Sequence, residues 1–233
     1  MVLKVDPDGY IGLENAQRFV DLRHSADSTT RIPLSKNVFD KTFAVFALVF
    51  FAPFILIIAL LILLTDGRPI FFRHERVGFR GKRFGCLKFR TMCRDSEQRL
   101  LQHLQHSPKA KAEWESSRKL TQDPRITLIG HFLRKSSLDE LPQLLNILAG
   151  EMSTVGPRPI VKDEARNYGR HYSNYKSLKP GLTGLWQVSG RSVVGYKERV
   201  LLDVHYTRNR SFIMDLKIVA KTIAVVLTGK GAM

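Results

Sequence analysis

The stretch FAVFALVFFAPFILIIALLILL, from Phe43 to Leu64, is a long apolar segment without a charged side chain, and it limits the possible folds more than any other part of the sequence. As an α-helix it is roughly 33 Å long, enough to cross the hydrocarbon core of a bilayer, which is about 30 Å thick. It lies too far from the first residue, and is too long, to be a secretory signal peptide. The sequence therefore predicts a membrane helix, and a helix buried in a soluble core is the less favoured alternative.

Two features of this segment bear on its topology. Pro53 lies at its midpoint, where a proline removes a backbone hydrogen bond and bends a helix. Both flanks are basic, with Lys36 and Lys41 before the segment and Arg68, Arg73, Arg76 and Arg80 after it. Positive residues favour the cytoplasmic side, and only a helix that enters the membrane, breaks and returns places both flanks there. We therefore expect a re-entrant helix over residues 34–66, broken at Pro53, with a kinked single span as the alternative.

The composition points to an anionic partner. Lys and Arg number 37 and Asp and Glu number 21, so the formal net charge is +16. Nucleic acid, a phospholipid surface and a phosphorylated substrate all fit such a charge. The basic residues interleave with rigid turns and form no recognition motif, so a membrane-anchored nucleic-acid binder is less favoured and no nucleic acid is expected. Cys86 and Cys93 lack zinc spacing, and we expect two reduced thiols.

The chain divides into three parts of different composition. Residues 1–33 are polar and predict a mobile lead-in, and residues 34–66 hold the membrane helix. Residues 67–233 predict a soluble domain that rests on the membrane interface. The whole is expected to be an α+β protein, mostly helical and monotopic, with interfacial amphipathic helices and a small β-hairpin.

Short patterns within the soluble domain predict its elements. The runs PIFFRHERVG and RFGCLKFRTM flank a turn and predict the hairpin. Residues 95–119 predict a polar helix or helical pair, and residues 126–135 predict a helix with one apolar face. Residues 211–227 predict an apolar helix, for which a place in the membrane interface and a place in the core both stay open.

The stretch RKSSLDELPQL, from Arg134 to Leu144, places two acids side by side in a basic chain. Ser137 and Glu140 have the spacing of a capping box, and Asp139 and Glu140 would both favour the positive end of a helix dipole. On the local pattern alone, helix capping stays open beside a role in chemistry.

Two loops offer candidate phosphate ligands. In GPRP, residues 156–159, Arg158 lies between two prolines that restrict the backbone on both sides. A rigid arginine suits bidentate recognition of phosphate, and a plain surface turn is the alternative. The glycine-punctuated loop KPGLTGLWQVSGR, residues 179–191, would place Arg191 near a ligand.

From about residue 34 onward, the chain resembles the bacterial sugar transferases, also called monotopic phosphoglycosyl transferases. The similarity lies in the blocks FGCLKFRTM, LRKSSLDELPQLLNILAGEMSTVGPRP, KPGLTGLWQVSGR and DLKI. Within that family it is most similar to the undecaprenyl-phosphate galactose phosphotransferases that start exopolysaccharide synthesis. The resemblance implies that a UDP-sugar donates its sugar 1-phosphate to undecaprenyl phosphate on the cytoplasmic face of the bacterial inner membrane, releasing UMP. A glucose or other hexose donor and a non-catalytic membrane scaffold are the alternatives, and a homodimer stays open.

The same resemblance implies roles for individual residues. Asp139 would attack the sugar-proximal phosphorus and carry a covalent phosphosugar, and Glu140, with Asp139, would hold Mg²⁺. The other residues that match are the phosphate-binding Arg134 and Lys88, and the further acids Asp203 and Asp215, whose roles are less defined. The family usually has serine before the proline that breaks the membrane helix, whereas this chain has Ala52. The chemistry is consistent, because a carboxylate that attacks a diphosphate needs cations and Mg²⁺ to neutralise the phosphate oxygens.

Overall fold

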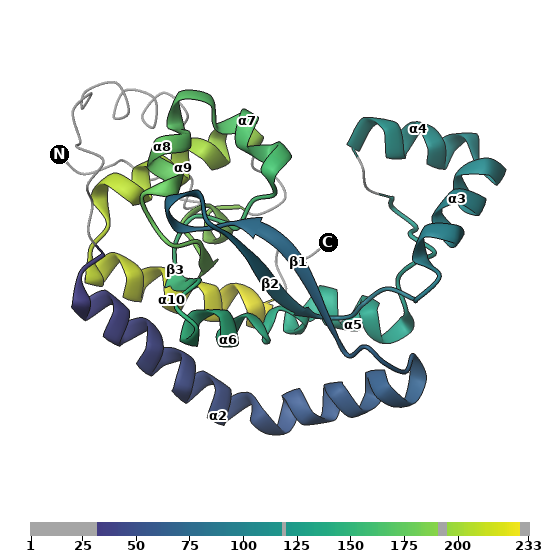
Figure 1. Ribbon diagram of the computed structural model, residues 1–233, viewed down its shortest axis with the longest axis horizontal. Coiled ribbons are helices and arrows are strands. Elements are labelled where there is room, and N and C mark those ends of the chain that lie inside the picture. Colours follow the sequence, from purple (N-terminus) through teal and green to yellow (C-terminus); the bar gives the residue numbers. More distant parts are fainter. Residues whose placement is uncertain (1–31, 118–119, 191–194, 229–233) are drawn as a thin grey trace.

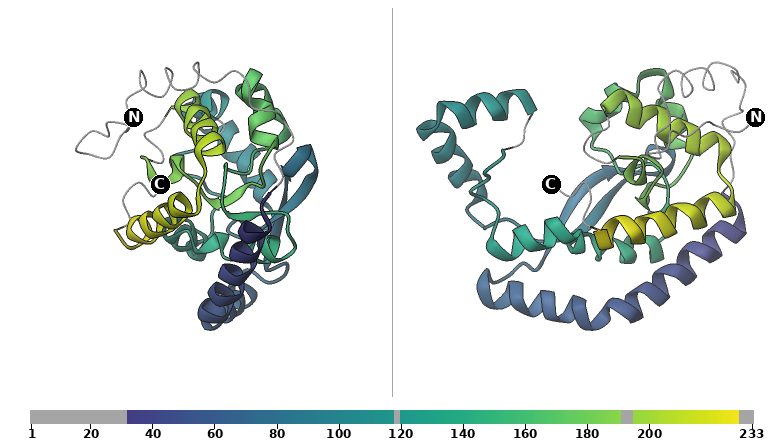
Figure 2. Two further views of the ribbon diagram at one scale, coloured as in Figure 1. Left: turned by 90° about the vertical axis from the view of Figure 1, so that its left-hand side faces the viewer. Right: turned by 180° about the vertical axis from the view of Figure 1, so that it is seen from behind.

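A computed structural model describes residues 32–117, 120–190 and 195–228. In these ranges a long helix, α2 (Leu34–Thr65), lies along one side of a body of shorter helices and two small sheets (Figures 1 and 2). Residues 1–31 fall outside the described residues, and so does nearly all of the predicted lead-in.

Helix α2 is continuous through Pro53, so the predicted break is a bend in an uninterrupted helix. The helix bows, and both of its ends turn toward the body (Figure 1). Near the N-terminal end, Ala44 is buried in a cluster with Ile147. Near the C-terminal end, Ile62 is buried in a cluster with Leu133. The two ends of the apolar helix therefore pack on the same body.

The outer side of α2 is apolar and exposed. The exposed side chains include Val45, Phe46, Val49, Phe50, Phe54, Leu56, Ile57, Leu60 and Leu64. Among the described helices, α2 alone is long and apolar enough to cross a membrane, judged by length and composition. Exposed apolar area of this extent is unfavourable in water, so this side needs a nonaqueous neighbour.

The predicted hairpin is confirmed as β1 (Phe71–Val77) and β2 (Arg83–Phe89), which pair antiparallel around the short turn η1 (Phe79–Gly81). In this register His74 lies opposite Cys86, and Phe72 lies opposite Lys88. Residues directly opposite one another share a face of the sheet. One face of the hairpin therefore carries Lys88 and the buried Cys86 together.

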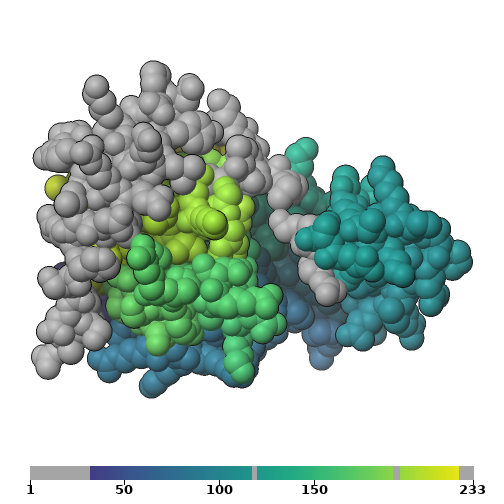
Figure 3. All heavy atoms as spheres, turned by 90° about the horizontal axis from the view of Figure 1, so that it is seen from above, coloured from purple at the N-terminus to yellow at the C-terminus, as the bar shows by residue number. Residues whose placement is uncertain are grey.

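The predicted helical pair is also confirmed, as α3 (Ser96–His106) and α4 (Pro108–Ser117). The two helices form an arm that stands beside the body (Figures 1 and 3). The helix predicted at residues 126–135 is α5 (Leu128–Ser136). Its Leu133 is fully buried, whereas Phe132 is exposed, so the apolar face is narrower than the sequence pattern predicts.

The rest of the body surrounds a second sheet of two parallel strands, β3 (Ser153–Val155) and β4 (Gly181–Thr183). A Cβ on Gly181 would collide with the backbone of Gly156, so only glycine allows this close approach. The remaining elements are η2 (Leu138–Glu140), α6 (Gln143–Leu148), η3 (Lys162–Glu164), α7 (Ala165–Tyr168), η4 (Gly169–His171), α8 (Tyr172–Lys176), η5 (Trp186–Val188), α9 (Tyr196–Asn209) and α10 (Phe212–Thr228).

The sequence left open whether helix α10 lies in the core or in the membrane interface. Asp215 and Ile218 are buried against the body, while Ile213, Leu216 and Ile223 are exposed. The helix therefore has a core side and an exposed apolar side. It fills part of the core and also presents apolar surface outward.

Candidate active site

The acid pair lies on η2, a single turn between α5 and α6. Ser137 has φ 59°, the left-handed conformation, and it ends α5 while its side chain makes no capping hydrogen bond. The α-helix that follows begins only at Gln143. The capping-box interpretation is therefore wrong, because spacing alone cannot reveal that Ser137 closes the preceding helix. Asp139 and Glu140 do not cap α6.

Lys88 joins the two acids. Its Nζ donates to Oδ2 of Asp139 at 3.3 Å and to Oε1 of Glu140 at 2.6 Å. Asp139 is buried, and Glu140 is half-buried. Strand β2 supplies the lysine and η2 supplies the acids, so the fold brings both carboxylates to one cationic point. Lys88, Asp139 and Glu140 are named the acid–lysine cluster below.

Burial and neighbouring charges shift the pKa values of Asp139 and Lys88 in this cluster. Burial raises the pKa of Asp139, while the neighbouring charge of Lys88 works in the opposite direction. Burial alone would lower the pKa of Lys88, but the carboxylates of Glu140 and Asp139 outweigh it and the pKa lies above its usual value. Lys88 is therefore held as a cation beside a partly desolvated carboxylate. This suits a nucleophile that must approach negatively charged phosphate.

Arg134 lies at the edge of the cluster. Its Nε donates to Oγ1 of Thr91 at 2.9 Å, which fixes the guanidinium. Burial lowers the pKa of Arg134, and the charge of Asp139 opposes this shift. The predicted Arg134 is thus brought to the acids. Thr91 was not predicted, because no local pattern marks a residue whose role depends on a contact made 43 positions along the chain.

Arg158 extends the positive charge away from the cluster. Its side chain is exposed, and its charge acts to lower the pKa of Lys88 and of Arg76. Nη2 of Arg76 in turn lies 3.0 Å from Nδ1 of His74. Neither Arg76 nor His74 was predicted as a site residue, although the alternation of the hairpin places them on the face that carries Lys88. Arg191 lies outside the described residues.

The structure gives Asp203 a set of contacts of its own. Asp203 is buried and accepts a 2.7 Å hydrogen bond from the hydroxyl of Tyr168. Burial raises the pKa of Asp203 to about 7, although the Tyr168 hydroxyl and the backbone N–H and charge of Arg158 favour the ionised form. Asp203 therefore lies close to the backbone of Arg158 in the GPRP loop.

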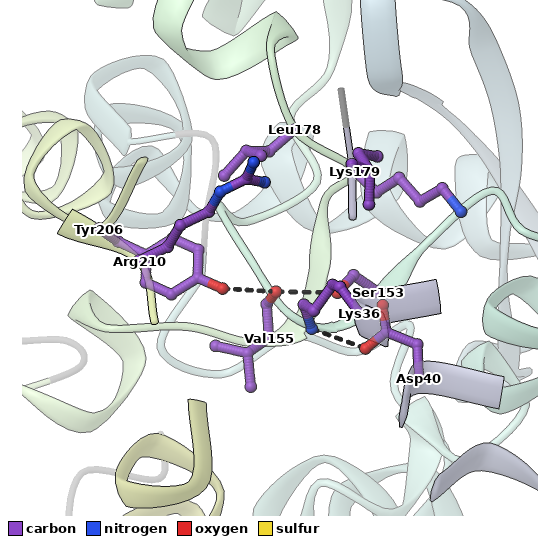
Figure 4. A pocket seen from close by; sticks show the side chains of 9 residues that line it. Lys36, Asp40, Ser153, Val155, Leu178, Lys179, Tyr206 and Arg210 are labelled. Atoms are coloured by element: carbon purple, nitrogen blue, oxygen red, sulfur yellow. Dashed lines mark hydrogen bonds and ion pairs between the residues drawn. The ribbon is translucent and has the colours of Figure 1, made fainter. Parts of the chain in front are cut away.

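Asp215 belongs to a separate network at the N-terminal end of α2. It accepts a 2.7 Å hydrogen bond from the hydroxyl of Tyr206, and its Oδ2 lies 3.2 Å from Nζ of Lys36. Figure 4 shows the surroundings, with the Lys36–Asp40 ion pair and the hydrogen bond from Tyr206 to the backbone of Val155. The carboxylate of Asp215 is thus engaged by a tyrosine and by a lysine of the membrane helix. A place for Asp203 and Asp215 in the active site stays a prediction.

The acid pair was predicted to hold Mg²⁺, and this stays a prediction. In residues 32–117, 120–190 and 195–228, no group of three or more His, Cys, Asp or Glu side chains could hold one. Mg²⁺ is commonly bound by only one or two carboxylates together with substrate phosphates. Asp139 and Glu140 already direct oxygen atoms at one cationic group, Nζ of Lys88. These residues therefore fit a magnesium ion that shares its ligands with a substrate.

Comparison with known proteins assigns the chain to a family. The family model described as bacterial sugar transferase matches residues 31–229. The chain belongs to the bacterial sugar transferase family. One relative is the exopolysaccharide production protein ExoY of Sinorhizobium fredii, 48% identical over 199 residues, which are 85% of this chain and 88% of that protein.

Two further relatives of this sugar transferase are longer proteins. The UDP-galactose-lipid carrier transferase of Erwinia amylovora is 48% identical over 197 residues, 84% of this chain and 41% of that protein. The undecaprenyl-phosphate galactose phosphotransferase of Salmonella typhimurium is 48% identical over 198 residues, again 84% of this chain and 41% of that protein. The resemblance in the sequence blocks is thus confirmed at the level of the family.

Proposed function

We propose that this sugar transferase moves a sugar 1-phosphate, galactose 1-phosphate in the first instance, from a UDP-sugar to undecaprenyl phosphate, as the first membrane step of exopolysaccharide synthesis. One observation carries the proposal: the buried Asp139 lies against Lys88, beside Glu140, in a basic surround. The names of the relatives support the acceptor and the galactosyl donor. Glucose or another hexose as donor is the second candidate.

The proposed reaction has two steps, both at Asp139. In the first, a carboxylate oxygen of Asp139 forms a bond to the sugar-side phosphorus of the donor, and the bond from that phosphorus to the bridging oxygen breaks, so that UMP leaves. In the second, a phosphate oxygen of the polyprenyl acceptor attacks the same phosphorus. The Asp139–phosphorus bond breaks, the carboxylate is restored, and the polyprenyl-diphospho-sugar forms.

The neighbours of Asp139 make the attack electrostatically feasible. Lys88 keeps a positive charge within 3.3 Å of the carboxylate and would neutralise a phosphate oxygen that approaches it. Arg134, fixed by Thr91, adds a guanidinium whose donor geometry matches phosphate. A Mg²⁺ ion, bound by Glu140 and Asp139, would supply further neutralisation of the phosphate oxygens.

The surroundings of the acids support a position at a membrane surface. Leu138 and Leu141, which flank the acid pair, pack in the same cluster as Ile55 and Ile58 of α2. The acids therefore lie close to the apolar helix just beyond Pro53. A lipid-borne acceptor phosphate and a water-soluble donor can meet there. Both ends of α2 pack on the body, which supports a re-entrant helix with the catalytic part on the cytoplasmic face of the inner membrane.

The test is UMP release from a panel of UDP-sugars by the detergent-purified chain with Mg²⁺ and undecaprenyl phosphate. The native chain is expected to release UMP with one donor, and Asp139→Asn is expected to abolish release because the amide is a poor nucleophile. Asp163→Asn is the matched control, because Asp163 is an exposed acid on η3. UMP release with UDP-glucose alone would show that the donor sugar is glucose and not galactose. No release with any donor, from folded chain in lipid, would favour a non-catalytic scaffold.

A further inference from the structure

We propose that Arg158 and Arg199, both placed over the ring of Trp186, form a second phosphate site that binds the nucleotide-side phosphate of the donor and of the UMP product. This inference rests on the proposed function and assigns Arg199 and Trp186 a part in it. The acid–lysine cluster would receive the sugar-side phosphate, and the second site would receive its neighbour.

The geometry joins three separate segments of the chain. The guanidinium carbon of Arg158, in the GPRP loop, lies 5.6 Å from the ring centre of Trp186. That of Arg199, on α9, lies 4.6 Å from the same ring. Trp186 is only 4% exposed and packs with the buried Leu202, so the ring is fixed. A fixed indole face holds guanidinium groups by cation–π attraction and limits their orientations.

The positively charged side chains at this site repel one another. Burial lowers the pKa of Arg199, and the positive charge of Arg158 lowers it further. Arg158 makes no ion pair with any described residue, and its charge also acts against Arg76. Glu164 lies 3.6 Å from Arg76 and is the acid whose charge also reaches Arg199. The charge of Arg158 thus opposes both Arg76 and Arg199, and the same carboxylate, Glu164, offsets this effect at both. A phosphate dianion would relieve this repulsion, because Arg side chains bind phosphate through paired N–H donors.

The charge of Arg158 relates the second site to the acid–lysine cluster. The charge of Arg158 reaches Lys88, the residue that contacts both acids. A diphosphate places its two phosphorus atoms one bridging oxygen apart, so the two phosphates need neighbouring cations. When the bridging bond breaks, the electron pair and its charge move to the UMP phosphate. Arg158 and Arg199 would stabilise that charge as it develops.

The experiment compares UMP with uridine, which lacks the phosphate, as ligands of the full chain in detergent, by isothermal titration calorimetry. The native chain is expected to bind UMP more tightly than uridine. Arg199→Gln is expected to weaken UMP binding by about tenfold or more, the size of a charge-assisted contact, and to leave uridine binding unchanged. Lys197→Gln is the matched control, since it removes the same charge from an exposed position on α9. It is expected to bind UMP as the native chain does.

A second variant pair tests the ring. Trp186→Phe retains an aromatic face and is expected to retain most of the UMP affinity, whereas Trp186→Leu is expected to lose it as Arg199→Gln does. If Trp186→Leu does not fold, the UMP affinity of Arg199→Gln, compared with that of Lys197→Gln, is the test of the second phosphate site. Equal UMP affinities in Arg199→Gln and Lys197→Gln would overturn the second phosphate site and leave the transferase proposal intact. A native chain that binds neither UMP nor a UDP-sugar would overturn both.

Discussion

Lys88 contacts both acids of the candidate site. It connects β2 to η2 through two carboxylates, 3.3 Å and 2.6 Å from its Nζ. Its charge opposes the effect of burial on the pKa of Asp139 and keeps that carboxylate closer to the ionised form. Only the ionised carboxylate can attack phosphorus. In the proposed reaction, Lys88 would therefore act on both the carboxylate of Asp139 and the incoming phosphate.

Replacing Lys88 by glutamine is expected to slow UMP release by at least about 100-fold, the usual cost of removing one preorganised charge from a polar transition state. The pKa of Asp139 rises when the cation is removed, so the acidic limb of the pH profile of kcat/KM should move to higher pH. The measurement is that profile for Lys88→Gln and for Lys82→Gln, which removes an exposed lysine beside the hairpin turn. A profile with an unmoved acidic limb would contradict this role.

The candidate site residues were predicted from the family resemblance, and their roles stay predictions. Asp139, Glu140, Arg134 and Lys88 stand in blocks that resemble a family, and the structure brings them together. Contacts such as the bond from Arg134 to Thr91 depend on the approach of distant segments, which no local spacing reveals. At Ser137 the sequence pattern was misleading. The residues have the spacing of a capping box, but Ser137 has a left-handed backbone conformation and ends the preceding helix, α5.

Helix α2 is the element that sets the position of the site. Its C-terminal end is held by Arg90, whose Nη2 donates to the backbone oxygens of Asp66 and Gly67, both at 2.8 Å. Its N-terminal end is held by the buried Asp40, which accepts from the backbone N–H of Thr154 at 3.0 Å and from Lys36 at 2.7 Å. A carboxylate buried at the edge of an apolar helix is costly unless it is paired in this way. The network therefore ties the start of α2 to β3.

Replacing Asp40 by alanine is expected to release the N-terminal end of α2, because Lys36 and the Thr154 N–H lose their shared acceptor. The measurement is the reaction of a membrane-impermeant maleimide with a Ser35→Cys thiol at the exposed start of α2, in a Cys93→Ser background. With Asp40 intact, labelling should occur only from the cytoplasmic side. With Asp40→Ala, a fraction should become reactive from outside.

Thr42→Ala, at an exposed position of the same helix, is the control for this labelling experiment. It leaves the contacts of Asp40 in place and is expected to label as the parent chain does. Identical labelling with and without Asp40 would show that the network does not set topology.

Elements with a clear period or turn were predicted, and short ones were not. The hairpin and the α3–α4 pair follow from alternation and polarity, and the structure confirms both. Strands β3 and β4 have three residues each, too few to show a period, and they exist because Gly156 and Gly181 let two segments approach closely. The capping-box spacing suggested a helix that starts directly after Ser137, whereas the η2 turn comes first and α6 begins only at Gln143.

The whole molecule combines a net charge of +16 with a band of exposed apolar side chains. The charge favours approach to an anionic surface, and this contribution weakens as salt screens it. The apolar contribution of α2 and of the outer side of α10 does not depend on screening. The electrostatic and the apolar contributions to membrane binding can therefore be measured separately.

The chain is expected to stay with sedimented membranes in about 1 M NaCl, where the screening length is about 3 Å, because apolar burial holds it. Detergent is expected to release it. The measurement is the distribution of the chain between pellet and supernatant after each wash, with a soluble basic protein as the control for charge alone. Complete release by salt would mean that α2 does not enter the hydrocarbon region.

In the proposed reaction, Asp139 carries the phosphosugar between donor and acceptor. The direct measurement is the intact mass of the native chain after incubation with Mg²⁺ and the donor found active, in the absence of undecaprenyl phosphate. We expect the mass to increase by one hexose phosphate, located on the peptide that contains Asp139 and lost when undecaprenyl phosphate is added. An unmodified chain that nevertheless forms product once the acceptor is present, or an adduct on another residue, would contradict it.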